Sequence, residues 1–555
     1  MRFPVRTCRD GSFSDARRRI AYVTVVITFA GVISIARPLA ASAATIASVS
    51  PGLTHTCAVT TSGGVKCWGQ NVDGELGNGT TTDSSIPVSV TGLSSGVAAV
   101  SSGARSSCAL TTAGGVLCWG VRLGNGVSGA KSSVPVTPTG LEAGVRAVSV
   151  GWDVSCVLMQ DATVRCWGSN SRGELGTGGD ATQAQLSPVT VPELTGVLAV
   201  SAGGVHVCAL MDTRTVKCWG YNAYGQVGDG SMDAAGVFVP TDVVGLSDIS
   251  SIEAGGYHSC AITSSGGAMC WGQDQYGELG DGANQNSAVP VAVTGLSSGV
   301  ASLAGGEYHT CAVTTSGSAK CWGANNIGAL GNGTTVNSSV PLDVPGHGAN
   351  VASISGGRGT TCSVDTFNRL DCWGWNLYGQ VGNGTTTSPV LNPTPVAWFA
   401  ASFNVTCTGL ICDASDTSTD AGGEIVSRTW SFGDGGSASG TSATHTYAAG
   451  GTYSVSLTAA DAVGVKSVAT RSVTVTSWNL RATVSKVRGS NVASLTWNAS
   501  ATASASIDVL RNGVKVATTS NVGSYSETLA KRGSFTYVVC PTGSMRCSNA
   551  VTVTV

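Results

Sequence analysis

The sequence predicts an all-β protein in which a seven-bladed β-propeller, residues 44–396, precedes two further strand-rich domains, residues 397–476 and 477–555. Three observations predict this class. The chain has 555 residues, which is too long for one ordinary domain. Only 11 % of the residues are charged and 76 are glycine, a composition typical of β-rich secreted proteins. A cysteine pair recurs seven times at a period near 50 residues, which indicates a repeat architecture.

Residues 1–43 have the organisation of a secretory signal peptide. An arginine-rich start is followed by an apolar run, residues 20–36, and then by the small residues Ala41-Ser42-Ala43. The alternative is an uncleaved anchor helix, but the run is short for a membrane span and Arg37 ends it. We therefore expect cleavage near Ala43. The mature protein would be extracellular, either free or loosely associated with the cell surface, with no membrane span.

The charge of the mature chain argues against one class of partner. The leader carries seven Arg and two Asp, so its removal leaves 23 basic and 30 acidic residues, a net charge of −7. Nucleic-acid binding requires a basic face that neutralises phosphates. We therefore expect no nucleic-acid partner.

The cysteines form regular pairs. Of 19 cysteines, Cys8 leaves with the leader, and the other 18 pair as Cys57 with Cys67, Cys108 with Cys118, Cys156 with Cys166, Cys208 with Cys218, Cys260 with Cys270, Cys311 with Cys321, Cys362 with Cys372, Cys407 with Cys412 and Cys540 with Cys547. Between Cys57 and Cys67, two β-prone runs flank a Ser-Gly-Gly turn, a hairpin signal. Folding about Ser62 places the two cysteines opposite each other, within disulfide reach. An exported chain meets an oxidising compartment, so we expect structural disulfides.

Metal binding and redox catalysis are the alternatives for these pairs. His55, His206, His258 and His309 each lie two residues before a first cysteine, but the other three repeats carry no histidine there. Zinc sites have tighter C-x2–4-C knuckles, and redox enzymes have a single reactive C-x-x-C. We predict no metal and no cofactor.

The repeat unit itself indicates propeller blades. The first cysteines are spaced by 51, 48, 52, 52, 51 and 51 residues, and each unit reads as about four strands separated by glycine-rich turns. Four-stranded units that cannot bury both faces alone stack radially, so seven copies predict seven blades. Each second cysteine is followed by a tryptophan, which we expect to pack between blades. These are Trp68, Trp119, Trp167, Trp219, Trp271, Trp322 and Trp373.

The pattern H-x-C-A-V/L-T…G-x-V-x-C-W-G-x-N-x-x-G-x-L-G-x-G resembles the repeat of the regulator of chromosome condensation (alpha-tubulin suppressor-like) family in its secreted, disulfide-bearing bacterial form. The resemblance covers residues 44–396 and implies a seven-bladed propeller. Repeat 2 departs, because its segment after Trp119 is shortened. The family namesake exchanges nucleotide on a nuclear GTPase, an activity not expected of an exported acidic chain. Other secreted propellers of this type inhibit β-lactamases, which implies that the fold can serve as a protein-binding disc.

Residues 397–476 resemble a polycystic-kidney-disease (PKD) domain. The resemblance rests on Trp430-Ser-Phe-Gly-Asp-Gly435, His445-Thr-Tyr447 and the strand-like run after Tyr453. It implies an Ig-like β-sandwich. The carboxylates of Asp413, Asp416 and Asp434 could bind Ca²⁺, but hydrogen bonds that stabilise turns are the simpler use.

Residues 477–555 resemble a fibronectin type III domain. Strand-like alternation, an Asn512-Gly513 hairpin turn and the candidate core residues Trp497 and Tyr537 carry the resemblance. We expect the pair of Cys540 and Cys547 to join the last two strands. The predicted fold class is therefore all-β, a seven-bladed β-propeller followed by two Ig-like β-sandwich domains.

No catalytic motif stands out, because the polar residues recur with the repeat whereas an active site needs unique groups in one pocket. Aromatic residues in the propeller turns depart from the repeat and form a candidate binding face, with packing between blades as the alternative. They are Trp152, Tyr221, Tyr224, Tyr257, Tyr276, Tyr308, Trp375 and Tyr378.

Two functional hypotheses follow. In the first, the protein is a non-catalytic extracellular binding protein, whose propeller face binds a protein or glycan while the two sandwiches act as a stalk. In the second, it is an inhibitor of extracellular hydrolases or an enzyme acting on cell-wall polymers. We expect the first.

Overall fold

The computed structural model describes residues 46–555 apart from 179–182, 421–424, 462–465, 503 and 545–546. The predicted signal peptide, residues 1–43, lies outside the described residues. The described part is all-β, as predicted; its one helical element is the short 3-10 turn η1 (Ala499–Ala501). In that part no helix has the length and apolar character to cross a membrane.

Residues 46–395 form seven four-stranded antiparallel sheets, the blades of a propeller. Their strands are β1 (Ile46–Pro51), β2 (His55–Thr60), β3 (Val65–Gly69) and β4 (Ser84–Ser89) in blade 1; β5 (Val97–Ser102), β6 (Ser106–Thr111), β7 (Val116–Val121) and β8 (Lys131–Val136) in blade 2; β9 (Val145–Val150), β10 (Val154–Met159), β11 (Val164–Gly168) and β12 (Gln185–Thr190) in blade 3; β13 (Val197–Ala202), β14 (His206–Met211), β15 (Val216–Gly220) and β16 (Val237–Asp242) in blade 4; β17 (Ile249–Ala254), β18 (His258–Thr263), β19 (Ala268–Gly272) and β20 (Ser287–Ala292) in blade 5; β21 (Val300–Gly305), β22 (His309–Thr314), β23 (Ala319–Gly323) and β24 (Ser338–Asp343) in blade 6; and β25 (Val351–Gly356), β26 (Thr360–Asp365), β27 (Leu370–Gly374) and β28 (Val390–Pro395) in blade 7.

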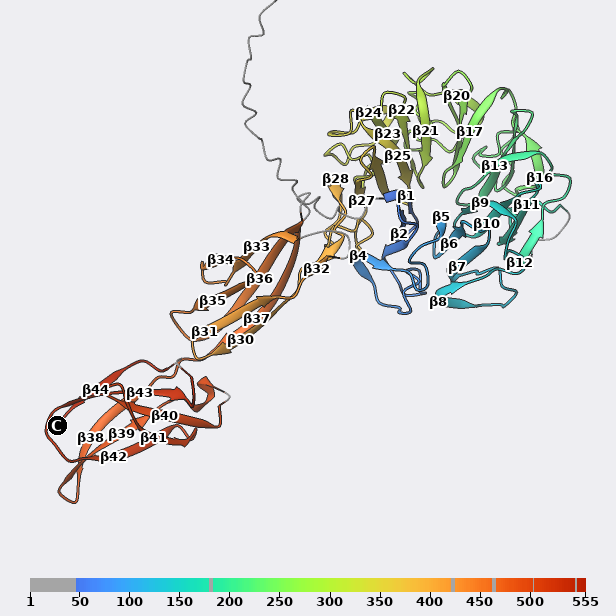
Figure 1. The fold of residues 1–555 in the computed structure, drawn as a ribbon. Coiled ribbons are helices and arrows are strands. Elements are labelled where there is room, and N and C mark those ends of the chain that lie inside the picture. The colour runs from blue at the N-terminus through green and yellow to red at the C-terminus, as the bar shows by residue number, and fades with distance from the viewer. Residues whose placement is uncertain (1–45, 179–182, 421–424, 462–465, 503, 545–546) are drawn as a thin grey trace, which may run out of the picture. The chain divides into compact units, whose positions relative to one another are not determined.

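Every blade has the same topology, with its four consecutive strands paired in sequence order. Figure 1 shows the blades arranged in a ring around a central axis. The ring closes where β1 packs against β25 and β26 of blade 7. At this junction the amide of Arg358 donates a 3.2 Å hydrogen bond to the carbonyl of Gly52. The first and last blades thus contact each other as any two neighbours do.

The recurring cysteine pair is a cross-strand staple. Cys57 lies opposite Cys67 on β2 and β3, with the two Cα atoms 4.1 Å apart in a disulfide. Gly63 has φ +79° in the connecting turn, a conformation that glycine adopts without strain. The other six blades have the same register and the same Cα separation. Their disulfides join Cys108 with Cys118, Cys156 with Cys166, Cys208 with Cys218, Cys260 with Cys270, Cys311 with Cys321 and Cys362 with Cys372, which are the pairs expected from the sequence.

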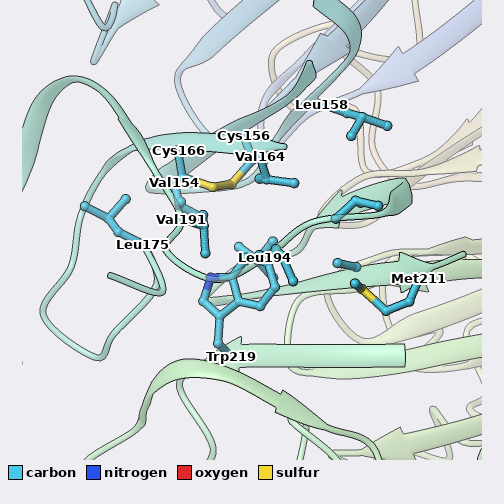
Figure 2. Packing of buried hydrophobic residues seen from close by; sticks show 13 residues of the cluster. Val154, Cys156, Leu158, Val164, Cys166, Leu175, Val191, Leu194, Met211 and Trp219 are labelled. Atoms are coloured by element: carbon cyan, nitrogen blue, oxygen red, sulfur yellow. A yellow bond between two sulfur atoms is a disulfide. The ribbon is translucent and has the colours of Figure 1, made fainter. Parts of the chain in front are cut away.

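The repeated tryptophan packs between blades, which confirms the prediction. Figure 2 shows Trp219 of blade 4 beside the Cys156–Cys166 disulfide of blade 3, among apolar side chains of both blades. Its indole Nε1 donates a 3.0 Å hydrogen bond to the carbonyl of Glu174 in blade 3. The other six tryptophans donate in the same way to the preceding blade, and Trp68 closes the ring by donating to Gln380.

One glycine of each loop after the third strand accommodates this indole. Gly228 has φ +79°, and a Cβ atom there would lie 2.6 Å from Nε1 of Trp271 in the next blade. The equivalent positions in the other blades also have positive φ and lie against the next tryptophan. They are Gly77, Gly124, Gly176, Gly280, Gly331 and Gly382.

The four histidines of the repeats are buried and join blades. Nε2 of His55 lies 2.7 Å from the Ser107 hydroxyl, and His206 makes the same contact with Ser259. Nε2 of His258 and of His309 lies 2.8 Å from Thr310 and Thr361, respectively. Each partner belongs to the next blade. Burial lowers the pKa of His55 and His309 to about 4 and that of His206 and His258 to about 3, so these rings are neutral at physiological pH.

The PKD region is a two-sheet β-sandwich. Its strands are β29 (Phe399–Ala400), β30 (Phe403–Thr408), β31 (Ile411–Asp416), β32 (Thr419–Asp420), β33 (Ile425–Ser431), β34 (Ser437–Ser439), β35 (Ser442–Thr446), β36 (Gly451–Asp461) and β37 (Lys466–Val475). The sheets β30-β31-β35 and β34-β33-β36-β37 share a core that contains Phe403, Trp430 and Tyr447. A disulfide joins Cys407 and Cys412 across β30 and β31.

The candidate calcium carboxylates of this domain make hydrogen bonds. Asp434 accepts from the Gly436 amide at 2.9 Å, and its other oxygen lies 2.7 Å from Nε2 of His445. Asp416 accepts from the Ser418 amide at 2.8 Å. Asp413 accepts from the hydroxyl of Thr444 at 2.7 Å. These contacts are of the turn- and strand-stabilising kind that the sequence favoured over Ca²⁺ binding.

The C-terminal region is a second two-sheet sandwich. Its strands are β38 (Arg481–Val487), β39 (Ser490–Thr496), β40 (Ser506–Arg511), β41 (Val514–Ser520), β42 (Ser524–Leu529), β43 (Ser534–Pro541) and β44 (Val551–Thr554), in the sheets β38-β39-β42 and β41-β40-β43-β44. Trp497 and Tyr537 lie in its core, and the Asn512-Gly513 turn connects β40 to β41. Cys540 on β43 forms a disulfide with Cys547, which precedes β44. The expectation that this bond joins the last two strands is wrong in that detail.

Candidate functional site

Two sets of loops open on the same face of the propeller. In blade 5, His258 at the start of the second strand pairs with Gly272 at the end of the third. The loop that precedes the second strand and the loop that follows the third therefore lie at one end of the blade. The β-hairpin between these strands lies at the other end. The repeat-breaking aromatic residues belong to the first two loops, so the register places all of them on one face.

Six of these residues form a continuous cluster, which we call the aromatic arc. It consists of Trp152, Tyr221, Tyr224, Tyr257, Tyr276 and Tyr308. Tyr257 is central: its ring meets Trp152 edge-on at 5.3 Å and Tyr224 edge-on at 5.7 Å, and it stacks on Tyr308 at 5.8 Å between centroids. These are the separations of favourable aromatic pairs.

The arc extends from the centre over blades 3 to 6. Tyr221 contacts Tyr224 at 6.0 Å, and Tyr276 contacts Tyr308 at 5.6 Å between centroids. None of the six side chains is fully buried, and Tyr276 is 36 % exposed. Burial raises the pKa of Tyr257 and of Tyr308 above the usual value, so both phenols are neutral. The rings thus pack on one another while part of each faces solvent, which combines the two interpretations that the sequence left open.

The other two predicted aromatic residues form a separate pair. Trp375 meets Tyr378 edge-on at 5.7 Å in blade 7. The guanidinium of Arg358 lies over the Trp375 ring at 5.1 Å and pairs through Nε with Glu307 at 2.8 Å. Because Glu307 directly precedes Tyr308, this ion pair connects the Trp375 pair to the arc.

The predicted binding face contained aromatic residues alone, but this face also carries charged residues. Besides Arg358, Arg172 lies over Tyr221 at 4.9 Å, and Arg122 pairs with Asp153. In blades 1 and 2, Asp73 pairs with Arg105 and with Lys131. Arg105, Asp153, Arg172 and Arg358 stand at the same loop positions as the aromatic residues in other blades. Their departure from the repeat is therefore the sequence feature that could have indicated them as residues of this face.

The central channel opens between the innermost strands. A cavity of about 250 Å³ there is lined by their C-terminal ends and by the glycines that follow. Ser101, Ser149 and Ser201 each accept a hydrogen bond at 2.9–3.0 Å from a backbone amide of the next blade. Glu253 takes the equivalent place in blade 5, and burial raises its pKa to about 7. These serine hydroxyls connect neighbouring blades, and in blade 5 Glu253 stands in the place of the serine.

The blades use their metal-ligating residue types in structural contacts. Within the described residues, no three side chains among His, Cys, Asp and Glu are placed to hold a metal ion. The cysteines on each blade form disulfides and the adjacent histidines bond to hydroxyls of the next blade. What this face provides is a broad aromatic surface with fixed arginines, an arrangement that suits recognition of another molecule.

Family models match most of the chain. The RCC1-like domain model matches residues 121–412, and models of the regulator of chromosome condensation (RCC1) repeat match residues 62–110 and 46–75. The PKD domain model matches residues 392–476, which confirms that domain. The fibronectin type III character of the last domain stays a prediction.

Curated relatives share the propeller. The ultraviolet-B receptor UVR8 of Arabidopsis thaliana is 29 % identical over 349 residues, which cover 60 % of this chain and 78 % of the receptor. The human E3 ubiquitin-protein ligase HERC2 is 33 % identical over 320 residues, which cover 55 % of this chain but only 6 % of the ligase.

Solved structures agree in fold. Prp20p from Saccharomyces cerevisiae, described with its binding properties to Gsp1p and histones, has a TM-score of 0.52 at 24 % identity and covers 57 % of this chain and 81 % of its own. Human WBSCR16 has a TM-score of 0.51 at 23 % identity and covers 58 % of this chain and 88 % of its own. At this identity the likeness concerns the fold alone.

Proposed function

The chain belongs to the RCC1-like domain family, and we propose that it is a non-catalytic binding protein whose propeller engages a protein partner through the aromatic arc. The continuity of the six rings carries the proposal. Exposed aromatic side chains that are already packed on one another lose little conformational freedom on binding, and they dominate the energetics of protein interfaces. Isolated rings in seven separate loops would lack this advantage.

The relatives support a binding role without naming the partner. UVR8 is a receptor, and Prp20p is described as binding Gsp1p and histones. The ligase activity in the name of HERC2 is not transferred, because the shared propeller covers 6 % of that protein. Gsp1p and histones are partners of Prp20p, and they are not proposed as partners of this chain.

We further propose that the protein acts outside the cell. Nine disulfides in one chain require an oxidising compartment to form and persist. The basic-apolar-small pattern of residues 1–43 supports export. In this proposal the propeller is the binding module and the two sandwiches serve as a stalk.

The test compares one arc variant with a matched control. Wild-type protein, Tyr257→Ala and Phe367→Ala are immobilised with their disulfides intact and exposed to the secreted proteins of the producing cell. Phe367 is a suitable control because it is 64 % exposed in the hairpin turn between β26 and β27, on the opposite face. Bound proteins are identified by mass spectrometry, and affinities are measured by surface plasmon resonance.

We expect Tyr257→Ala to weaken binding of the captured partner by at least about 30-fold, the effect of losing a hot spot of about 2 kcal/mol. Phe367→Ala should retain full affinity. Equal affinity of wild type and Tyr257→Ala would remove the arc from the interface. Absence of any partner together with turnover of a cell-wall glycan or peptide would replace the binding role by catalysis.

A further inference from the structure

A cavity of about 290 Å³ lies between blades 6 and 7 on the face that carries the arc. Tyr308 and Trp375 contribute aromatic walls, Ile327 and Ala329 contribute apolar surface, and the Glu307–Arg358 ion pair lies at its edge. It is smaller than the roughly 300–1,000 Å³ clefts that hold whole small molecules. Its size suits a single large side chain.

Two aromatic positions of the repeat carry small residues beside this cavity. Gly359 directly precedes the second strand of blade 7, where blades 5 and 6 have Tyr257 and Tyr308. Ala324 follows the third strand of blade 6, where blades 4 and 7 have Tyr221 and Trp375. Both small residues line the cavity. The arc is therefore interrupted between Tyr308 and Trp375, where Ile327 lies against Gly359 and the cavity lies beside them.

The edge of the cavity carries a positioned cation. Arg358 is held by its Nε contact with Glu307 and by its place over Trp375, and 43 % of its side chain is exposed. The Glu307 side chain is 10 % exposed and also hydrogen-bonds with the side chain of Tyr308. Because the contact with Glu307 is made through Nε and the Arg358 side chain is partly exposed, the guanidinium can still receive a carboxylate from a bound molecule. Arginine binds carboxylates through paired N–H donors.

We propose that this cavity is the anchor pocket for one large apolar side chain of the protein partner, and that Arg358 pairs with a carboxylate next to that residue. The proposal rests on the proposed function and specifies the chemistry of the partner. A glycan fits less well, because Arg358 covers one face of Trp375 and sugars bind by stacking on free aromatic faces. An apolar residue beside Asp or Glu satisfies both the walls and the cation.

The test uses an immobilised library of ten-residue peptides, probed with the full oxidised chain. The library contains large apolar residues placed next to Asp or Glu, and otherwise identical peptides with Asn or Gln. A glycan array is probed in parallel. The selected peptide is then titrated in solution against Gly359→Tyr, which places in blade 7 the side chain present in blades 5 and 6, and against Arg358→Gln. Val205→Tyr is the control, because Val205 is the equivalent position of blade 4, outside the pocket.

We expect selection of an apolar residue beside Asp or Glu. Gly359→Tyr should weaken binding at least tenfold, and Arg358→Gln should remove the preference for Asp over Asn. Val205→Tyr should bind as wild type. A Cβ at Gly359 would meet the end of the Ile327 side chain, so Ala324→Trp serves as a second pocket-filling variant with the same expected loss, and thermal unfolding of each variant verifies its fold.

Three results would overturn the proposal: selection without an acidic residue, peptide affinity unchanged in both pocket-filling variants, or glycan binding that these variants abolish. The two proposals are separable. If Tyr257→Ala weakens the captured partner while Gly359→Tyr, Ala324→Trp and Arg358→Gln do not, the arc binds the partner and the pocket does not.

Discussion

Substitution of Gly228 by alanine tests whether each blade is locked by the fit of a tryptophan against a glycine of its neighbour. Gly228 has φ +79°, and an added Cβ would lie 2.6 Å from Nε1 of Trp271. That nitrogen donates a 3.0 Å hydrogen bond to the carbonyl of Gln226. Trp271 is fully buried among apolar side chains of both blades, so the ring cannot move away without disturbing this packing and the hydrogen bond.

Gly230 provides the matched control in the same loop. It has φ +88°, and the nearest atom to an added Cβ is a methyl carbon of Val244 at 3.9 Å. Both alanines adopt the left-handed conformation at a cost of about 1–2 kcal/mol. Only Gly228→Ala collides with Trp271, which adds about 1–3 kcal/mol for overpacking and about 1 kcal/mol for the weakened hydrogen bond. We expect total losses of about 3–6 kcal/mol for Gly228→Ala and about 1–2 kcal/mol for Gly230→Ala.

The assay is urea unfolding of the full oxidised chain, followed by tryptophan fluorescence. Because the chain has several domains, the free energy of unfolding is taken from the propeller transition alone. Amide hydrogen exchange of β18 and β19 locates the loosened region. If the two alanines destabilise the propeller equally, backbone strain accounts for the whole effect, and the collision with Trp271 is not what requires glycine.

Three further outcomes concern stability. Burial lowers the pKa of His309 to about 4, from an unfolded value near 6.5. The neutral ring therefore contributes its full share of the free energy of unfolding above pH 6.5, and this share is lost as the pH falls through about 4. In urea titrations between these two pH values, the stability of wild type should fall relative to His309→Gln by up to about 1.4 kcal/mol per pH unit. Burial raises the pKa of Glu278 from 4.5 to about 7, so its contribution to the free energy of unfolding is present below pH 4.5 and is lost as the pH rises through about 7. Over that range the stability of Glu278→Gln should rise relative to that of wild type. A stability difference that does not change with pH would contradict this assignment. Replacing Cys156 and Cys166 together by alanine should cost about 3 kcal/mol by the chain-entropy model, measured as the shift of the urea midpoint, and an unchanged midpoint would show that this staple contributes nothing.

Much of the propeller could be predicted from local sequence. The hairpin between Cys57 and Cys67 is specified by a turn and by the symmetry of the residues around it, so its register follows from the sequence alone. The tryptophan after each second cysteine recurs at a fixed offset, which indicates a structural role. The PKD domain could likewise be identified, because its Trp-x-Phe-Gly-Asp-Gly turn is contiguous.

The candidate site could be predicted only in part. Departures from the repeat indicated the aromatic residues, but whether they packed between blades or faced solvent depended on their radial position. The roles of Arg172 and Arg358 were not predicted, because a charged residue in a loop gives no sign of the ring that it covers. The contact between His55 and Ser107 of the next blade could also not be predicted from the sequence, since the two residues lie 52 positions apart.

The sequence by itself determined the β-class of the chain, the blade repeat, the hairpin registers and the PKD domain, because each depends on residues close together in the chain. Only the tertiary structure decided which loop residues meet. Tyr224, Tyr257 and Tyr308 come from different blades and touch because the ring brings equivalent loops to one face. The pocket beside Trp375 is a clearer case still. It lies next to Gly359 and Ala324, whose positions carry aromatic rings in other blades, and its shape is set by neighbours that come from two blades and are far apart in the chain.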